Sequence, residues 1–116
     1  MEINIPMSIK MGEDEIPLKD FSELYAYYVI FDVLNGLLKY LYAINIMSRC
    51  NGTLKYTKRY LRKHTMDEHM YQRLLCYLKD CGGHCDCEVL YNFSAEQYAK
   101  SGIYKEFSLT LSEIVD

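Results

Sequence analysis

The sequence predicts an α+β fold, in which a long N-terminal helix and a helical hairpin pack with a small, mainly antiparallel sheet. Three observations lead to this prediction. An alternating apolar pattern opens the chain, a long apolar run at helical spacing follows it, and two shorter helical patterns come next. With 116 residues, 50% of them hydrophobic, the chain can bury a core of its own, so we expect a single domain over residues 1–116.

The first expected element is a strand over residues 2–10. Apolar residues stand at every second position of this segment, which is the pattern of a strand with one buried face. Pro6 indicates an edge strand, because proline cannot donate to a neighbouring strand. The acidic residues that follow, within residues 12–17, are interpreted as a connector.

The second expected element is a helix over residues 21–47. Asp20 and Glu23 resemble a capping box at its start. Its apolar residues spread over more than one face, so either both faces are buried in the fold or one contacts a second copy of the chain. We therefore predict a homodimer through this helix. Its charges and Gly36 argue against a membrane span.

Two shorter helices are expected at residues 53–64 and 67–79, where apolar residues recur at helical spacing. Residues 65–68 between them have the composition of a turn and an N-terminal cap. Gly82 and Gly83 end the second helix. The two helices should therefore form a hairpin.

The C-terminal part is expected to alternate between strand and helix. Apolar residues at alternate positions predict a strand over residues 88–93. Ser94 is a suitable cap for a short helix that extends through Lys100. A second alternating pattern over residues 107–111 predicts a last strand.

The chain has five cysteines, an odd number, and residues 1–10 do not resemble a secretory signal. We therefore expect a cytoplasmic protein. In a reducing compartment, closely spaced cysteines indicate metal ligation or redox chemistry before they indicate disulfides. Cys76, between Leu75 and Tyr77 in an expected helix, is interpreted as a core residue.

A cysteine-rich segment predicts a metal site. Cys85 and Cys87 would point to opposite faces of an extended segment, but in a tight turn after two glycines they can converge. Cys81 and His84 lie just before them, and the helical hairpin would bring Cys50 back to the same place. These five side chains supply enough sulfur and nitrogen ligands for a four-coordinate zinc ion.

Two alternatives to a metal site follow from the same residues. In the first, Cys50, Cys76 and Cys81 are small buried hydrophobic residues, and the remaining two cysteines are incidental. In the second, Cys85 or Cys87 is a reactive thiol that pairs with Cys81. The second is less favoured, because no strand-helix C-x-x-C context accompanies these residues.

Residues 50–93 also resemble an uncharacterised bacterial family of unknown function. The family pattern ends in Gly-Gly-aromatic-Cys-Asp-Cys-Glu-Val-Leu-x-Asn, and residues 82–92 follow it closely. The resemblance implies that Cys50, Cys85 and Cys87 form one spatial cluster. It implies no activity, because the family has none established.

The chain departs from this family pattern at two positions. Gly52 stands where the family has a histidine two residues after Cys50, and His84 takes the place of the aromatic residue. If the family binds a metal ion through three cysteines and that histidine, then His84 or Cys81 must supply the fourth ligand here.

A basic helix is the main sign of another function. The formal net charge of −3 gives no global reason to expect nucleic-acid binding. The expected helix 53–64 nevertheless concentrates positive charge that could meet phosphates or an acidic partner. Its basic residues are Lys55, Lys58, Arg59, Arg62 and Lys63. A solvated helix face explains the same pattern.

Catalytic motifs are hard to find in this sequence. The histidines have no serine elbow, phosphate loop or His-Glu-x-x-His arrangement near them. Asp86 and Glu88 are expected to orient metal ligands or cap the turn rather than act as acid and base. The predicted function is therefore a non-enzymatic accessory or interaction module with a structural zinc or other metal site. A nucleic-acid-binding module is the first alternative, and a zinc- or thiol-dependent enzyme is the second.

Overall fold

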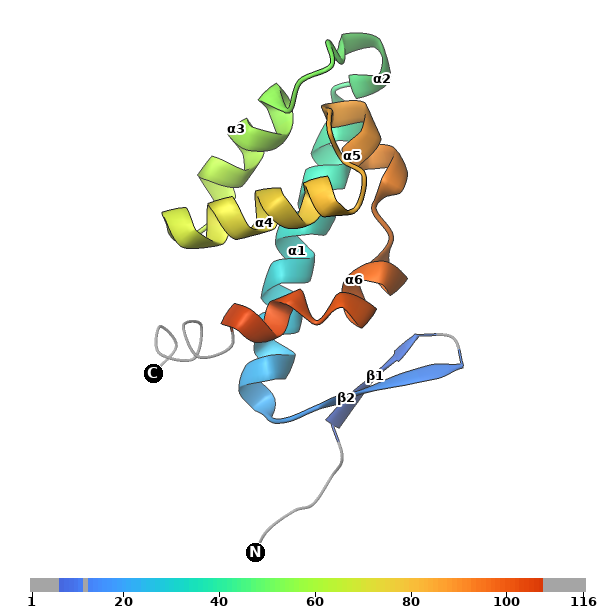
Figure 1. Ribbon diagram of the computed structural model, residues 1–116, viewed down its shortest axis with the longest axis vertical. Coiled ribbons are helices and arrows are strands. Elements are labelled where there is room, and N and C mark those ends of the chain that lie inside the picture. Colours follow the sequence, from blue (N-terminus) through green and yellow to red (C-terminus); the bar gives the residue numbers. More distant parts are fainter. Residues whose placement is uncertain (1–6, 12, 108–116) are drawn as a thin grey trace, which may run out of the picture. The chain divides into compact units, whose positions relative to one another are not determined.

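The computed structural model describes residues 7–11 and 13–107, and these form two compact units. Unit 1 contains the described residues up to Ile30 and those from Ala95 onward, and unit 2 contains Phe31–Ser94. The elements, labelled in Figure 1, are β1 Met7–Met11, β2 Asp14–Leu18, α1 Phe21–Ala43, α2 Ile46–Arg49, α3 Lys55–His64, α4 Glu68–Asp80, α5 Asp86–Asn92, α6 Ala95–Ser101 and the 3-10 helix η1 Ile103–Phe107. The α+β class, with a long N-terminal helix and a small antiparallel sheet, is confirmed. The single domain stays a prediction.

Unit 1 begins with a two-stranded antiparallel hairpin of β1 and β2. The expected strand is confirmed over Met7–Met11, and residues 2–6 lie outside the described part of the chain. The expected connector over residues 12–17 is wrong, because most of it is strand β2. Ile16 pairs with the buried Ile9, while Glu15 pairs with Lys10 on the opposite face and accepts a hydrogen bond from a serine hydroxyl of β1. Glu15 therefore lies on the exposed side of a strand.

Helix α1 starts as the capping box predicts. The Glu23 N–H donates to the Asp20 carboxylate over 3.1 Å, and the Glu23 carboxylate accepts from the Lys19 N–H over 2.7 Å. The helix ends at Ala43, before the expected end at residue 47, because Asn45 adopts a left-handed conformation with φ of 56°. The single-turn helix α2 then follows.

The core of unit 1 is built around a tyrosine cluster of Tyr27, Tyr98 and Tyr104. The Tyr27 ring stacks on Tyr98 with centroids 5.3 Å apart and meets Tyr104 edge-on at 5.2 Å. The Tyr98 hydroxyl donates to the Tyr27 carbonyl oxygen over 2.7 Å.

The expected helix after Ser94 is confirmed as α6. The expected strand over residues 107–111 is wrong at Phe107, which ends η1, and its remaining residues lie outside the described range.

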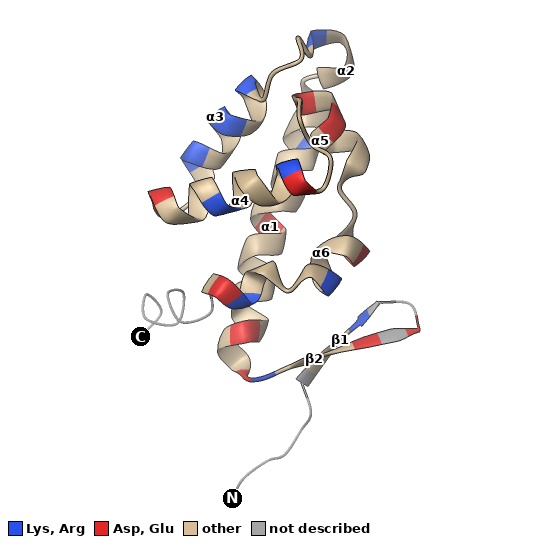
Figure 2. Cartoon of the chain, viewed as in Figure 1, with Lys and Arg blue, Asp and Glu red and all other residues tan. Residues whose placement is uncertain are grey.

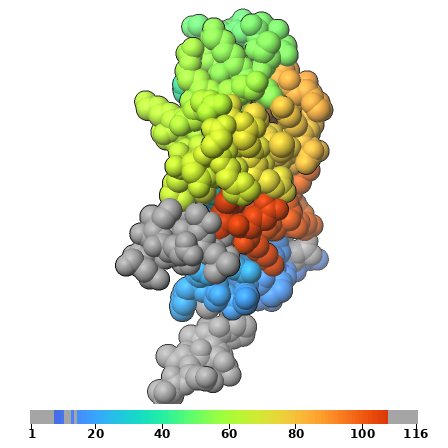
Figure 3. All heavy atoms as spheres, turned by 60° about the vertical axis from the view of Figure 1, so that its left-hand side comes forward, coloured from blue at the N-terminus to red at the C-terminus, as the bar shows by residue number. Residues whose placement is uncertain are grey.

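All the regular secondary structure of unit 2 is helical. The expected helices 53–64 and 67–79 are confirmed as α3 and α4, and they lie side by side (Figure 3). Asp67 caps α4 by accepting from the Met70 N–H over 2.7 Å. Lys and Arg residues are concentrated on α3 (Figure 2). The buried aliphatic residues of the unit are Leu34, Leu37, Leu41, Ile46, Leu54, Leu61, Leu74, Leu75, Leu78 and Val89.

The expected strand over residues 88–93 is wrong, because Asp86–Asn92 is helix α5. The alternation was short and contained one β-branched residue, Val89, which in the helix points into the core. Among the described helices, none is long and apolar enough to cross a membrane.

Candidate functional site

Three cysteine side chains converge in unit 2, and we call them the sulfur cluster. Cys50 directly follows α2, Cys85 directly precedes α5, and Cys87 lies in the first turn of α5. All three sulfur atoms lie within 4.8 Å of one another, and Cys85 Sγ and Cys87 Sγ are 3.3 Å apart. All three cysteines are unbridged. The arrangement could hold a metal ion.

Local backbone conformation explains why Cys85 and Cys87 face the same side. Cys85 is extended, with φ of −146° and ψ of 169°, and the helix begins at the next residue. The change from extended to helical backbone turns the second side chain back toward the first. Cys50 is also extended and ends α2, where its N–H donates to the Ile46 carbonyl over 2.8 Å. The start of α5 therefore brings Cys85 and Cys87 together, where a tight turn was expected.

Asp86, between the two cysteines, fastens α5 to α3. Its carboxylate accepts hydrogen bonds from the backbone N–H groups of Tyr56 at 3.1 Å and Thr57 at 2.8 Å, and its own N–H donates to the Thr53 carbonyl at 2.9 Å. Leu54, the residue at the N-cap position of α3, has no side-chain oxygen to do this. Asp86 is 1% exposed, so it caps α3 from a distant part of the chain. Asp86 was expected either to orient metal ligands or to cap a turn. It acts as a cap, but the element that it caps is helix α3.

Two glycines allow α4 and α5 to approach closely. Gly83 donates its N–H to the Leu78 carbonyl, and a Cβ there would lie 2.8 Å from a methyl group of Val89. Gly82 has φ of 95°, and its carbonyl accepts from the Asn92 side chain over 2.9 Å. Gly82, Gly83 and Asn92 of the sequence pattern therefore hold together the two ends of the segment that contains Cys85 and Cys87.

The pKa values of Cys50 and Cys85 are shifted in opposite directions. Burial alone would raise the pKa of Cys50, but hydrogen bonds from the backbone N–H groups of Cys87 and Gly52, and from the two other thiols, lower this pKa below its ordinary value. The Glu88 N–H lowers the pKa of Cys85, but burial, the two other thiols and the Glu88 carboxylate outweigh it and raise the pKa to about 12. Cys50 therefore forms a thiolate more readily than Cys85, and a metal ion would have to displace the Cys85 proton.

The structure does not place the other two expected ligands in the sulfur cluster. His84 is exposed, and Cys81 is half-buried at the C-terminal end of α4; the group of ligand atoms within 4.8 Å contains neither. The expectation that Cys76 is a core residue is wrong, because its side chain is exposed. Helix α4 buries its leucine face, and Cys76 lies on the other face with Gln72 and Lys79.

Sequence reasoning missed the bridge from Asp86 to α3. The available signal was indirect: Leu54 is a poor cap, so the N-terminal N–H groups of α3 needed an acceptor from elsewhere. The sequence alone gives no way to choose which acidic residue provides it.

Residues 37–92 match a family model described as a protein of unknown function, DUF2695. The match lies entirely within unit 2 and includes the whole sulfur cluster. No curated protein and no solved structure matches the chain. The resemblance to an uncharacterised family is therefore confirmed over residues 37–92, which are similar to this family of unknown function.

Proposed function

We propose that the chain is a non-enzymatic accessory or interaction module of the cytoplasm, stabilised by a structural zinc ion bound to the sulfur cluster. The convergence of Cys50, Cys85 and Cys87 carries this proposal. A reducing compartment would keep these thiols available to a metal ion. The role of the ion would be to hold together segments that lie far apart in the chain.

The spacing of the sulfur atoms suits zinc. Zinc–thiolate bonds of about 2.3 Å in a tetrahedral arrangement place sulfur atoms about 3.8 Å apart. Cys85 Sγ and Cys87 Sγ are 3.3 Å apart, and all three sulfurs lie within 4.8 Å of one another. Shifts of up to about one ångström would bring the three sulfur atoms to the spacing of a tetrahedral site, and side-chain rotation supplies shifts of that size.

His84 is our candidate for the fourth ligand. It directly precedes Cys85, and its exposed imidazole can rotate without disturbing the core. Cys81 is the second candidate, but it is tied to the end of α4, where its N–H donates to the Tyr77 carbonyl. A protein ligand in this position would close the site, which is the arrangement of structural zinc.

Elemental analysis of unstripped protein tests the proposal. We expect about one zinc ion per chain, with loss of the metal and of thermal stability in Cys50→Ser and Cys87→Ser. Cys76→Ser is the matched control, because it makes the same chemical change at an exposed thiol outside the cluster. Less than about 0.2 metal ion per chain, with unchanged melting temperatures in the cluster variants, contradicts the proposal.

Cobalt substitution distinguishes a structural site from a catalytic one. Cobalt in a closed site should show a tetrahedral thiolate spectrum that added azide or cyanide leaves unchanged. His84→Ala should alter this spectrum, whereas Cys81→Ser should not. A spectrum that shifts on addition of azide would indicate an open position and favour the zinc-enzyme alternative.

A further inference from the structure

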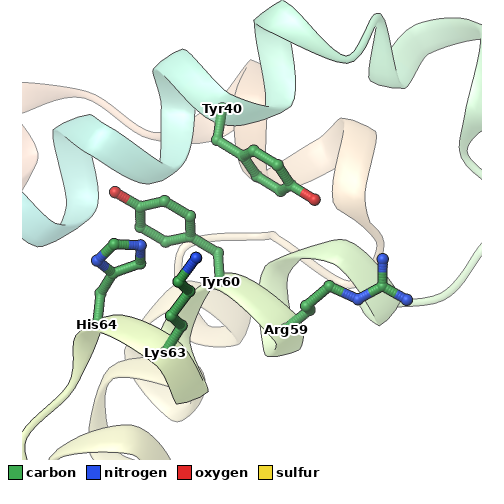
Figure 4. Close-up of a pocket in the computed structure, with 5 residues that line it drawn as sticks. All are labelled: Tyr40, Arg59, Tyr60, Lys63 and His64. Atoms are coloured by element: carbon green, nitrogen blue, oxygen red, sulfur yellow. The ribbon is translucent and has the colours of Figure 1, made fainter.

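We propose that a pocket between α1 and α3 binds a nucleotide, either free or as one unit of a single-stranded nucleic acid. The pocket has a volume of about 180 Å³ and lies within unit 2. Tyr40 extends from α1, and the other lining residues extend from α3 toward it (Figure 4). The lining residues are Tyr40, Arg59, Tyr60, Lys63 and His64. This inference is independent of the sulfur cluster and of the proposed zinc ion.

The charge of the pocket selects an anionic ligand. Arg59 and Lys63 are four residues apart on α3, so they lie on the same face one turn apart. Neither the Arg59 nor the Lys63 side chain is buried, and none of the five lining residues is acidic. Arg59 also lies over the Tyr56 ring, 5.6 Å from its centroid, while Arg62 lies outside the pocket and is engaged with Glu68 at 3.0 Å and with the Tyr71 ring. Guanidinium and ammonium groups placed in this way suit a phosphate.

The aromatic residues of the pocket select a ligand with a flat ring. Tyr40 and Tyr60 are stacked with centroids 5.4 Å apart, and Tyr60 and His64 are stacked at 4.1 Å. Tyr40 and Tyr60 are both half-buried, so each residue keeps part of its surface accessible. Aromatic side chains beside positive charges are the usual means of binding single-stranded nucleic acid, because any base can stack on them.

The size of the pocket limits the ligand to a small unit. Pockets for whole drug-sized ligands or cofactors usually measure about 300–1,000 Å³. A volume of about 180 Å³ is smaller than this range. It suits one nucleotide better than a dinucleotide cofactor, and an accessible aromatic platform does not suit a base that is stacked in a duplex.

Gly36 keeps this pocket in shape. The Tyr60 hydroxyl lies against Gly36 of α1 so closely that a Cβ there would collide with it. Burial of the Tyr60 side chain also raises its pKa. The absence of a side chain at residue 36 therefore fixes where the ring of Tyr60 lies.

Binding measurements on the full chain test the proposal at one fixed salt concentration. The probes are 5′-AMP, a short single-stranded oligonucleotide, a duplex of the same length and inorganic phosphate. We expect AMP or the single strand to bind, and the one that binds tighter identifies the source of the nucleotide. Arg59→Gln/Lys63→Gln should weaken binding about 10-fold or more, whereas Lys55→Gln/Lys58→Gln, with the same charge change on the same helix, should change it less than about threefold.

Variants of Tyr40 test the contribution of ring stacking to the affinity separately from that of charge. Tyr40→Phe should keep the affinity, and Tyr40→Leu should weaken it on the order of 10-fold, because it removes the ring but retains the bulk. Circular dichroism checks that both variants fold. The proposal is overturned if neither AMP nor the single strand binds, if both double variants lose binding equally, if phosphate binds as tightly as AMP, or if the duplex binds as tightly as the single strand.

Discussion

The tyrosine cluster of unit 1 and the sulfur cluster of unit 2 join distant parts of the chain in different ways. The Tyr98 hydroxyl reaches the Tyr27 carbonyl across 71 residues of sequence, and the Cys87 N–H reaches the Cys50 sulfur across 37. The tyrosine rings are buried and contact one another directly, so burial, ring contacts and one hydrogen bond stabilise them without a metal ion. The sulfur cluster is small, and its strongest possible interaction needs a metal ion. The first cluster should therefore contribute stability at all times, and the second only when the ion is bound.

The largest effect is expected in the tyrosine cluster. Tyr98→Ala removes a fully buried ring, which should lower the free energy of unfolding by about 3–5 kcal/mol. Urea unfolding with and without zinc measures this loss. The loss should be the same under both conditions, and a loss that appears only with zinc would refute the contrast between the two clusters.

Zinc should have the next largest effect. With free zinc a hundredfold above its dissociation constant, the free energy of unfolding should rise by about 2.7 kcal/mol, because the ion binds the folded state. Thermal unfolding of metal-free protein titrated with zinc measures this rise. Cys87→Ser should abolish it, and Cys76→Ser should leave it unchanged. A similar rise in Cys87→Ser would place the zinc elsewhere.

Asp86→Ala should cost about 2 kcal/mol, because two N–H groups at the start of α3 lose a buried charged acceptor. Asp67→Ala is the matched control at the exposed cap of α4, where we expect a loss of about 1 kcal/mol. Chemical denaturation of metal-free protein compares the two. Equal losses would show that Asp86 acts as an ordinary cap and not as a link between α3 and α5.

Two hydroxyl deletions sharpen the description of the tyrosine cluster. Tyr98→Phe should cost about 1 kcal/mol, because the Tyr27 carbonyl loses its donor. Tyr104→Phe should be neutral or slightly stabilising, since its buried hydroxyl has no hydrogen-bond partner among the described residues. Thermal unfolding of both variants checks this. A larger loss for Tyr104→Phe than for Tyr98→Phe would reverse the assignment.

The smallest effect concerns Gly36. Replacing glycine by alanine within a helix ordinarily stabilises it by somewhat less than about 1 kcal/mol. Here the new methyl group meets the Tyr60 hydroxyl, so Gly36→Ala alone should give no such gain. In a Tyr60→Phe background, which shortens the opposing side chain, the gain should return. A double-mutant cycle of melting temperatures measures this coupling, and additive effects would contradict it.

Sequence patterns predicted the elements that depend on local interactions. Helices α1, α3 and α4 have long apolar periodicity, and Asp20 and Asp67 provide caps within a few residues of the N–H groups they accept from. Two of the incorrect predictions, those at β2 and α5, concern short segments. Strand β2 has five residues, two of them acidic, and the segment of α5 showed an apolar residue at only three alternate positions. Such short patterns contain too few positions to distinguish a strand from a loop or a helix. Pairing with β1 makes residues 14–18 a strand, and the hydrogen bonds of Asp86 to α3 contribute to the helical conformation of α5.

The sequence by itself predicted five candidate metal ligands, because the spacing of cysteine, histidine and glycine is visible without coordinates. It predicted the ligands Cys50, Cys85 and Cys87, which the structure brings together. Only the tertiary structure decided that His84 and Cys81 lie outside the cluster and that Cys76 is exposed. The direction in which a side chain points depends on the backbone conformation and on contacts between distant segments. Residue spacing alone does not specify either.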